Sequence, residues 1–253
     1  MMLDRIISVS NRTTVFRDGG NAVKVYRASY PKSSILNEGM NLTLAEELGL
    51  PVPQFRQITT VENRWAMIMD YIAGKTFLRM LTESPLKTDA LLSRWTALQR
   101  TIHEKRCAAL PQVNDLAAQR IEASGLPSDL IRRLSARLQT LPRGHEVCHG
   151  EFALSNAMES AGGKAFALDW KHAMQGSGEA DGAWTYLLMQ LDGFDKEAEL
   201  YRERFVSLKG VDAALFEQWI PLGAAAHYRE SNERKRALLL SYIETADRRE
   251  REK

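Results

Sequence analysis

The sequence predicts an α+β protein in which a small β-rich region comes first and a larger helical region follows. Residues 4–27 are rich in strand-forming residues and contain the turn sequence Asp18-Gly19-Gly20-Asn21. Two further strand-like runs, 54–60 and 64–70, flank a short turn and predict a hairpin. From Pro85 onward apolar residues recur at helical spacing. Strands followed by helices, without alternation, indicate segregated β and α regions.

The second predicted strand, residues 22–27, carries a lysine. Successive side chains of a strand point to opposite faces, so Val23 and Val25 share one face and Lys24 and Tyr26 share the other. An exposed lysine on a sheet surface is the ordinary interpretation, since lysine is mostly solvated. From this strand alone, that interpretation is favoured over a functional one.

The next predicted element is a helix, with Ser33 or Ser34 as its N-cap and Glu38 in its first turn. It ends at Gly49, because glycine after the last turn followed by proline is a stop signal. Its apolar positions recur at helical spacing: Leu36, Met40, Leu44 and Leu48. On charge alone, Glu38 is equally well explained as a carboxylate near a positive helix N-terminus.

The second half is predicted to be mainly helical. One buried helix face is expected from Leu91, Trp95, Leu98 and Ile102. His103, beside that face, is interpreted as a core or boundary histidine. The glycine-rich segment 175–182 is expected to be a loop, with Asp181 as the N-cap of the helix that follows. Pro221 is expected to break the helical pattern near the C-terminus.

The stretch from Val147 to Trp170 gathers the polar residues with the clearest chemistry. Its second part predicts a hairpin with a turn near Gly162. Antiparallel pairing about that centre places Asn156 opposite Leu168, and Asp169 within one residue of Asn156. A carboxamide and a carboxylate at the open end of a hairpin suit Mg²⁺, which proteins hold with one or two side chains plus phosphate oxygens.

The composition limits the kinds of partner and location that we expect, but it does not indicate a function. The 253 residues carry 34 Lys and Arg against 32 Asp and Glu, a formal charge of +2, which offers no argument for a nucleic-acid or membrane partner. Two cysteines, Cys107 and Cys148, do not make a disulfide framework or a zinc site. The sequence predicts neither a signal peptide nor a membrane helix. We therefore expect a cytoplasmic location. The oligomeric state is not readable.

The spacing within the central stretch is also a signature. It reads His149-x-Glu151-x-x-x-x-Asn156, followed by Asp169, with glycine after the histidine and tryptophan after Asp169. In this form it resembles the aminoglycoside phosphotransferase and choline kinase family. The resemblance implies the bilobal protein-kinase-like fold, with an N-terminal nucleotide-binding lobe over residues 1–72 and a helical lobe over 73–253.

The resemblance also implies a function and site residues. It implies transfer of the γ-phosphate of ATP, or alternatively of GTP, to a hydroxyl of a small molecule such as an aminoglycoside, a choline-like amine or a sugar. Lys24 would contact the nucleotide phosphates and pair with Glu38. The interlobe hinge, whose backbone binds the adenine edge, would be Met69, Asp70, Tyr71 and Ile72. Asn156 and Asp169 would hold Mg²⁺, and His149 and Asp181 would support the catalytic loop.

One position departs from the family pattern, and it leaves two hypotheses. The family usually has aspartate where this chain has Glu151, the expected catalytic residue. The extra methylene displaces the carboxylate by roughly 1.5 Å, and a misplacement of about 1 Å can cost on the order of a hundredfold in rate. The chain is therefore either an active small-molecule kinase adapted to glutamate or a nucleotide-binding regulator without catalysis. A protein-kinase activity is less favoured, because no Ala-Pro-Glu segment follows Asp169.

The acceptor is not named by any motif. An acidic group could line a pocket for a cationic substrate, although an ordinary charged surface is the more common role of such residues: Asp192, Asp195, Glu197 and Glu199. Three aromatic residues could likewise form a cage for a quaternary amine, with burial in the core as the simpler interpretation: Trp184, Trp219 and Tyr228. A Cys148–His149 dyad is not favoured, because adjacent residues of a strand point to opposite faces.

Overall fold

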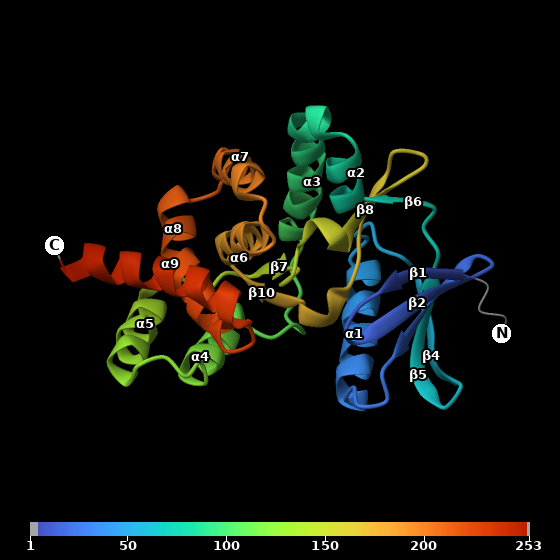
Figure 1. The fold of residues 1–253 in the computed structure, drawn as a ribbon, viewed down its shortest axis with the longest axis horizontal. Coiled ribbons are helices and arrows are strands. Elements are labelled where there is room, and N and C mark those ends of the chain that lie inside the picture. Colours follow the sequence, from blue (N-terminus) through green and yellow to red (C-terminus); the bar gives the residue numbers. More distant parts are fainter. Residues whose placement is uncertain (1–4, 252–253) are drawn as a thin grey trace. The chain divides into compact units, whose positions relative to one another are not determined.

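The computed structural model describes residues 5–251 (Figure 1), so Asp4, the first residue of the predicted strand region, lies outside the described residues. The chain divides by packing into two compact units. One, which we call the sheet unit, comprises the chain up to Pro85 together with Leu154–His172. The other, the helical unit, comprises Leu86–Ala153 and the chain from Ala173 onward. The resemblance implied a boundary after residue 72, between a nucleotide-binding lobe and a helical lobe. That division concerns function rather than packing, and it stays a prediction.

The sheet unit is built on a five-stranded antiparallel sheet in the order β1-β2-β3-β5-β4. The strands are β1 (Arg5–Val9), β2 (Thr13–Asp18), β3 (Asn21–Tyr26), β4 (Phe55–Val61) and β5 (Arg64–Asp70). Val23 and Val25 of the central strand pack on Ala66 and Ile68 of β5, which forms the core of one face. Both predicted hairpins are therefore present, as their turn sequences indicated.

Helix α1 (Lys32–Glu47) packs against this sheet beside β4 and β5 (Figure 1). The helix and its end before Gly49, which has φ of 70°, are confirmed, but its predicted start and buried face were wrong. Its N-cap is Pro31 rather than Ser33 or Ser34, so Glu38 lies in the second turn. The buried face consists of Ile35, Glu38, Gly39, Asn41, Leu42 and Ala45. Leu36 and Met40 are instead about half exposed, because the face that packs inward carries Glu38 and Asn41, which have partners in the interior.

A small three-stranded sheet completes the sheet unit and confirms the hairpin register. Its strands are β6 (Gly74–Thr76), β8 (Ala157–Ser160) and β9 (Ala165–Ala167), in the order β6-β8-β9. Ala157 pairs with Ala167, which centres the turn on Gly162. The Leu168 N–H donates to the Asn156 carbonyl at 2.7 Å, as the predicted pairing requires. Helix α2 (Phe77–Glu83) follows β6.

The helices of the helical unit pack mainly on α6 and α8. Its helices are α3 (Thr88–His103), α4 (Val113–Glu122), α5 (Ser128–Thr140), α6 (Gly178–Leu191), α7 (Asp195–Val206), α8 (Ala213–Tyr228) and α9 (Glu233–Arg251). All four apolar positions predicted for α3 are buried. A short ladder, β7 (Glu146–Cys148) with β10 (Met174–Gly176), precedes and follows the central stretch. The α+β class is confirmed.

Two local predictions in the helical unit were wrong. Segment 175–182 is not a loop, because it contains the end of β10 and the first turns of α6, with Ser177 as the N-cap in place of Asp181. Its glycines serve close packing: a Cβ on Gly182 would lie 2.4 Å from the Phe205 ring. Pro221 does not interrupt the helical pattern either, since it lies inside α8.

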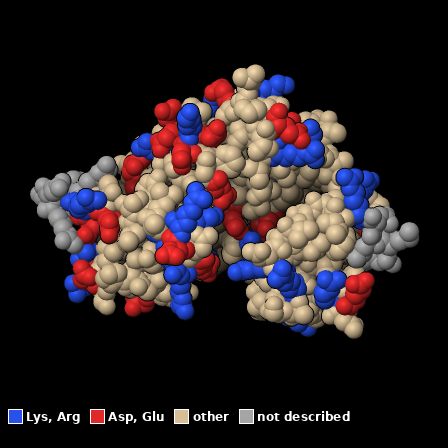
Figure 2. All heavy atoms as spheres, viewed as in Figure 1, with Lys and Arg blue, Asp and Glu red and all other residues tan. Residues whose placement is uncertain are grey.

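Charges of both signs are interspersed over the face of the helical unit that Figure 2 shows. Within the predicted acidic group, Asp192 pairs with Lys235 at 3.0 Å and Glu199 pairs with Arg202 at 3.3 Å. This is an ordinary charged surface. Among the described residues, no helix is both long and apolar enough to span a bilayer.

Candidate active site

A buried ion pair lies between β3 and α1 in the sheet unit. The Lys24 ammonium is 2.5 Å from Glu38 Oε1, and the Tyr26 hydroxyl donates to Glu38 Oε2 at 2.9 Å. Lys24 is 7% exposed and Glu38 1%, so the exposed-lysine interpretation is excluded and the predicted pair is confirmed. Burial opposes the charged ammonium, but the carboxylates of Asp169 and Glu38 outweigh it and raise the pKa of Lys24.

Asp169 is the third member of this cluster. Its Oδ1 is 3.0 Å from the Lys24 ammonium, and its Oδ2 is 3.3 Å from the ammonium of Lys171. Its backbone is left-handed, with φ of 62°, a conformation that is unfavourable for a residue with a Cβ and that is concentrated at functional sites. The carboxylate is thus held by two cations at a position that the local sequence alone would not favour.

Helix α1 also fixes the segment around Asp169. Asn41 is buried and donates through its side chain to the Trp170 carbonyl at 3.0 Å. Trp170 is buried as well, and its indole N–H donates to the Ala167 carbonyl at 3.3 Å. At the open end of the hairpin, the backbone pairing of Asn156 with Leu168 places Asn156 beside the strand that leads into Asp169. Asn156 and Asp169 are therefore neighbours at one hairpin end, as predicted.

The four predicted hinge residues lie at the end of β5 and just after it. The N–H of Asp70 donates to the Gln54 carbonyl at 3.0 Å, and the N–H of Tyr71 donates to the Gly20 carbonyl at 2.9 Å. Met69 is paired in the sheet with Ala22. Internal hydrogen bonds thus occupy the N–H groups of Asp70 and Tyr71. An adenine edge would have to use the N–H of Ile72 or the carbonyl groups, and this role of the hinge stays a prediction.

The predicted catalytic loop belongs to the helical unit. Gly150 has φ of 79°, which only glycine adopts without strain, and its N–H donates to Asp181 Oδ1 at 2.7 Å. His149 is fully buried, and its Nδ1 accepts the Glu151 N–H at 3.3 Å. The imidazole also packs edge-on against Phe152. His149 thus holds the turn that presents Glu151.

Asp181 lies at the centre of a second buried network. Its Oδ2 accepts hydrogen bonds from Gln99 Nε2 at 3.0 Å and from His103 Nε2 at 2.9 Å. The Tyr201 hydroxyl donates to Gln99 Oε1 at 2.6 Å and completes the chain. Burial would raise the pKa of Asp181, but these hydrogen bonds and the charge of His103 outweigh it and lower the pKa to about 2. Asp181 is therefore an ionised brace for the Gly150 backbone.

Cys148 has no part in a nucleophilic dyad. Its thiol is buried and directed to the backbone carbonyls of Glu146 and Ser177, at 3.6 and 3.5 Å. Burial raises the pKa of the thiol well above its usual range, so it stays protonated. The core interpretation of Trp184 and Trp219 is confirmed in the same way, since both are buried.

The structure brings the predicted residues together in two groups. Lys24, Glu38 and Asp169 contact one another in the sheet unit, whereas the loop of Glu151 and its support Asp181 belong to the helical unit. Two participants were missed, Lys171 and Gln99. His103 is buried, which confirms its core interpretation, although its contact with Asp181 was not predicted. Gln99 and His103 carried one weak signal, because they are polar residues four apart on the helix that buries Trp95 and Ile102.

The donor set of the sheet unit fits a magnesium ion that is shared with phosphate. Among the described residues, no group of three or more histidine, cysteine or acidic side chains could hold a metal by itself. Mg²⁺ bound together with nucleotide phosphates needs only one or two protein oxygen ligands. The Asp169 carboxylate and the Asn156 carboxamide supply that number.

Known proteins share this fold. The model of the phosphotransferase enzyme family (APH) matches residues 5–218. The aminoglycoside phosphotransferase APH(4)-Ia superimposes with a TM-score of 0.69 at 14% identity, over 95% of this chain and 91% of that chain. Choline kinase LicA from Streptococcus pneumoniae gives a TM-score of 0.59 at 14% identity, over 97% and 94%. APH(3'')-Id from Streptomyces rimosus, solved with ADP and streptomycin, gives 0.60 at 16%, over 84% and 90%. No curated protein sequence matches the chain.

Proposed function

The chain belongs to the phosphotransferase enzyme family, and we propose that it is a small-molecule kinase that transfers the terminal phosphoryl group of ATP to a hydroxyl group in the presence of Mg²⁺. The observation that carries this proposal is the buried Lys24–Glu38 pair, which meets Asp169 at 3.0 Å. A variant of the similar enzyme APH(4)-Ia was solved with AMP-PNP and hygromycin B, which supports nucleotide binding by the same fold.

Lys24 is the residue that would contact the nucleotide phosphates. Phosphoryl transfer needs positioning and charge neutralisation more than covalent help from the protein. Glu38 and the Tyr26 hydroxyl hold the Lys24 side chain in one orientation, and its raised pKa keeps it cationic. A buried, fully charged and oriented ammonium is suited to this task, because little reorganisation is needed when phosphate binds.

Asn156 and Asp169 are the residues that would hold Mg²⁺. Bound there, the ion would neutralise charge on the phosphate oxygens. The left-handed backbone of Asp169 and the fixed Trp170 segment restrict where that carboxylate can lie. The chain therefore supplies a rigid oxygen donor rather than a flexible one, as precise phosphate placement requires.

Glu151 is the residue that would orient the acceptor hydroxyl or accept its proton. Its turn is held from two sides, by His149 through the Glu151 N–H and by Asp181 through the Gly150 N–H. A general base needs geometry before it needs a particular pKa. A rigid turn is one way in which a chain can adapt to the longer glutamate side chain.

The alternative function is a nucleotide-binding regulator without catalysis. The observation in its favour is Glu151, which replaces the usual aspartate of this family. Against it, the Lys24–Glu38 pair and the Asp169 carboxylate are intact, whereas a site that has lost catalysis often loses its metal ligands as well. Both alternatives predict nucleotide binding, so turnover separates them.

The decisive experiment measures phosphate transfer from ATP with Mg²⁺ to a panel of aminoglycosides, choline-like amines and sugars. Wild type is compared with Asp169→Asn and with Glu62→Gln, a control in an exposed turn of the same unit. Losing one electrostatic contact to a transition state costs roughly 10²–10³ in rate, which is the loss expected for Asp169→Asn. Equal turnover in Asp169→Asn and wild type would refute the assignment of Asp169.

Glu151 is tested with the same assay. Glu151→Gln, which keeps size and removes the charge, is expected to lower turnover by about 10²–10³, the typical contribution of a positioned base. Asp129→Asn, an exposed change in the helical unit, is the control. If wild type binds ATP but transfers to no acceptor, and Glu151→Asp gains activity, the regulator is the correct function.

A further inference from the structure

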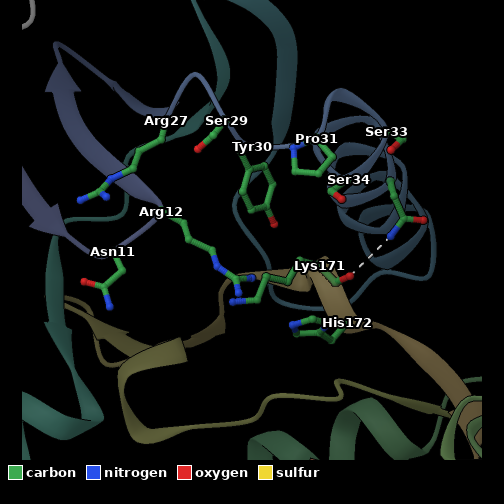
Figure 3. Close-up of a pocket in the computed structure, with 11 residues that line it drawn as sticks. Asn11, Arg12, Arg27, Ser29, Tyr30, Pro31, Ser33, Ser34, Lys171 and His172 are labelled. Carbon is green, nitrogen blue, oxygen red and sulfur yellow. Dashed lines mark hydrogen bonds between the residues drawn. The ribbon is translucent and has the colours of Figure 1, made fainter. Parts of the chain in front are cut away.

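The sheet unit contains a cavity of about 790 Å³ that the roles proposed above do not use (Figure 3). Three segments line it: the turn between β1 and β2, the chain that leads from β3 into the first two turns of α1, and the two residues that follow Trp170. We call it the Arg12 pocket. All three segments belong to the same compact unit.

The lysine and arginine side chains that line the Arg12 pocket give it charges of one sign: Arg12, Arg27 and Lys171. The other lining residues except Pro31, His172 among them, are hydrogen-bonding residues. No aspartate or glutamate lines it within the described part of the chain. In Figure 3 the Arg12 side chain extends toward Lys171 and the Tyr30 hydroxyl points to the same space, while Arg27 points away. The charge favours an anionic ligand.

The turn that carries Arg12 is rigid and keeps its backbone donors occupied. Ser10 Oγ accepts the N–H of Arg12 at 3.2 Å and the N–H of Thr13 at 3.0 Å. The Arg12 carbonyl accepts the Arg27 N–H at 3.0 Å. Protein kinases cover the nucleotide phosphates with a glycine-rich loop. Here those two N–H groups are already used, so the turn meets an anion through the Arg12 guanidinium instead.

The first turn of α1 adds a second attractive element. It contains no acidic residue, and its N-cap Pro31 makes no side-chain hydrogen bond to it. A helix N-terminus carries about half a positive charge and unsatisfied N–H groups, which attract oxyanions. Ser33 and Ser34 of this turn line the pocket. The start of α1 and the side chains of Arg12 and Lys171 thus line one cavity.

Lys171 connects the pocket to the candidate metal site. It lines the cavity, and its ammonium is 3.3 Å from Asp169 Oδ2. The other oxygen of that carboxylate contacts Lys24. An anion in the Arg12 pocket would therefore lie next to the cluster that we assign to the nucleotide phosphates, separated from Asp169 by the Lys171 side chain.

We propose that the Arg12 pocket binds an oxyanion of the phosphate class through Arg12, Lys171 and the first turn of α1. The oxyanion has two sources with the same chemistry: the terminal phosphate of the nucleotide, or an acidic group on a separate ligand such as the acceptor. Guanidinium and ammonium groups form charge-assisted hydrogen bonds to phosphate. Binding to the pocket does not depend on phosphoryl transfer, so it survives if the proposed function fails.

The test is calorimetric titration of the full chain with inorganic pyrophosphate in the absence of metal. Wild type is compared with Arg12→Gln and Lys171→Gln, and with Arg64→Gln, which removes an exposed arginine elsewhere in the same unit. Arg12 is exposed, so its substitution leaves the fold intact, and a melting curve checks this. Each pocket variant is expected to bind pyrophosphate about tenfold more weakly than wild type, which is the effect of losing one charge-assisted hydrogen bond. Arg64→Gln is expected to bind as wild type does.

Two further titrations identify the source. ATP and AMP are compared in wild type and Arg12→Gln, and pyrophosphate is titrated into protein saturated with ATP. One result is that Arg12→Gln binds ATP about tenfold more weakly than wild type but binds AMP equally well, and that ATP prevents pyrophosphate from binding. In that case the pocket holds the terminal phosphate of the nucleotide. If ATP affinity is unchanged and pyrophosphate still binds, the pocket serves an acidic group of another ligand. Each of these results supports the proposal.

The proposal is overturned in either of two cases. The first is that wild type does not bind pyrophosphate. The second is that wild type, Arg12→Gln and Lys171→Gln bind it with equal affinity. Neither result depends on turnover, so an inactive chain can still show the site, and an active kinase can still lack it.

Discussion

Two buried carboxylates organise this molecule, one in each unit, and their surroundings differ. Glu38 in the sheet unit is 1% exposed and Asp181 in the helical unit is 2% exposed. Glu38 is neutralised by the ammonium of Lys24, which also reaches Asp169. Asp181 is instead surrounded by hydrogen-bond donors: a backbone N–H, an amide and an imidazole.

This difference separates binding from positioning. The Glu38 cluster consists of charges that can be shared with a ligand, and Lys171 extends it to an open cavity. Protein groups occupy the oxygens of both carboxylates, but the partners of Asp181 are all buried: the Gly150 N–H, Gln99 and His103. We therefore expect a substitution of Asp181 to lower mainly the stability of the fold. A substitution of Glu38 is expected to lower mainly kcat/KM for ATP.

The largest stability loss is expected for Asp181→Ala. It removes the acceptor of Gly150, Gln99 and His103 at once and leaves buried donors unsatisfied. Removing one partner of a buried ionic network costs about 3–5 kcal/mol of unfolding free energy. Urea denaturation measures this loss. The control Asp129→Ala, at an exposed carboxylate, should change stability by less than about 1 kcal/mol. A similarly small loss for Asp181→Ala would show that its network is dispensable.

Glu38→Gln should show the opposite balance. Lys24 keeps its contact with Asp169, so the charge is not left alone, and unfolding free energy is expected to fall by only about 1–2 kcal/mol. Because the ammonium loses its fixed orientation, kcat/KM for ATP should fall about a hundredfold. Steady-state kinetics beside denaturation would measure both. Unchanged kinetics with a large stability loss would make the pair a structural one.

The Asp181 network should also give stability a dependence on acid. The folded pKa of Asp181, about 2, lies below the ordinary value of 3.8. A depressed pKa stabilises the fold above the unfolded value, and that contribution is lost as pH falls toward the folded value. The stability difference between wild type and Asp181→Asn should therefore shrink between about pH 4 and pH 2, by on the order of 2 kcal/mol. A difference that does not change with pH would contradict the ionised state.

The smallest effect is expected at the periphery of the same network. Tyr201→Phe removes the hydroxyl that donates to Gln99 Oε1 at 2.6 Å and leaves the ring in place. The loss of one buried hydrogen bond costs about 1 kcal/mol. Turnover should stay near the wild-type level, because Gln99 still contacts Asp181. A large fall in turnover with normal stability would extend the catalytic support as far as Tyr201.

Local pattern predicted the elements well and their partners less well. The turn sequence near Gly162 was enough to place Asn156 opposite Leu168, because one turn determines the register of a hairpin. The helix after β3 was expected too, but its leucines suggested the wrong buried face. Glu38 and Asn41 face inward because they have hydrogen-bond partners there: Glu38 binds the Lys24 ammonium, and Asn41 donates to the Trp170 carbonyl. Hydrophobic periodicity carries no information about such polar partners.

The sequence by itself determined the α+β class, the hairpin register and the family signature, since each depends on neighbours along the chain or on a spaced motif. The pairing of Lys24 with Glu38 was implied by the family resemblance, because the strand and the helix alone favoured other interpretations. Only the tertiary structure decided that Asp169 meets Lys24, 145 residues away, that Asp181 meets His103, 78 residues away, and that Lys171 lines a cationic cavity. Local propensities favour structure within about one helix or hairpin, whereas contacts across such separations form only when the core packs. The residues that the sequence missed belong to this second kind.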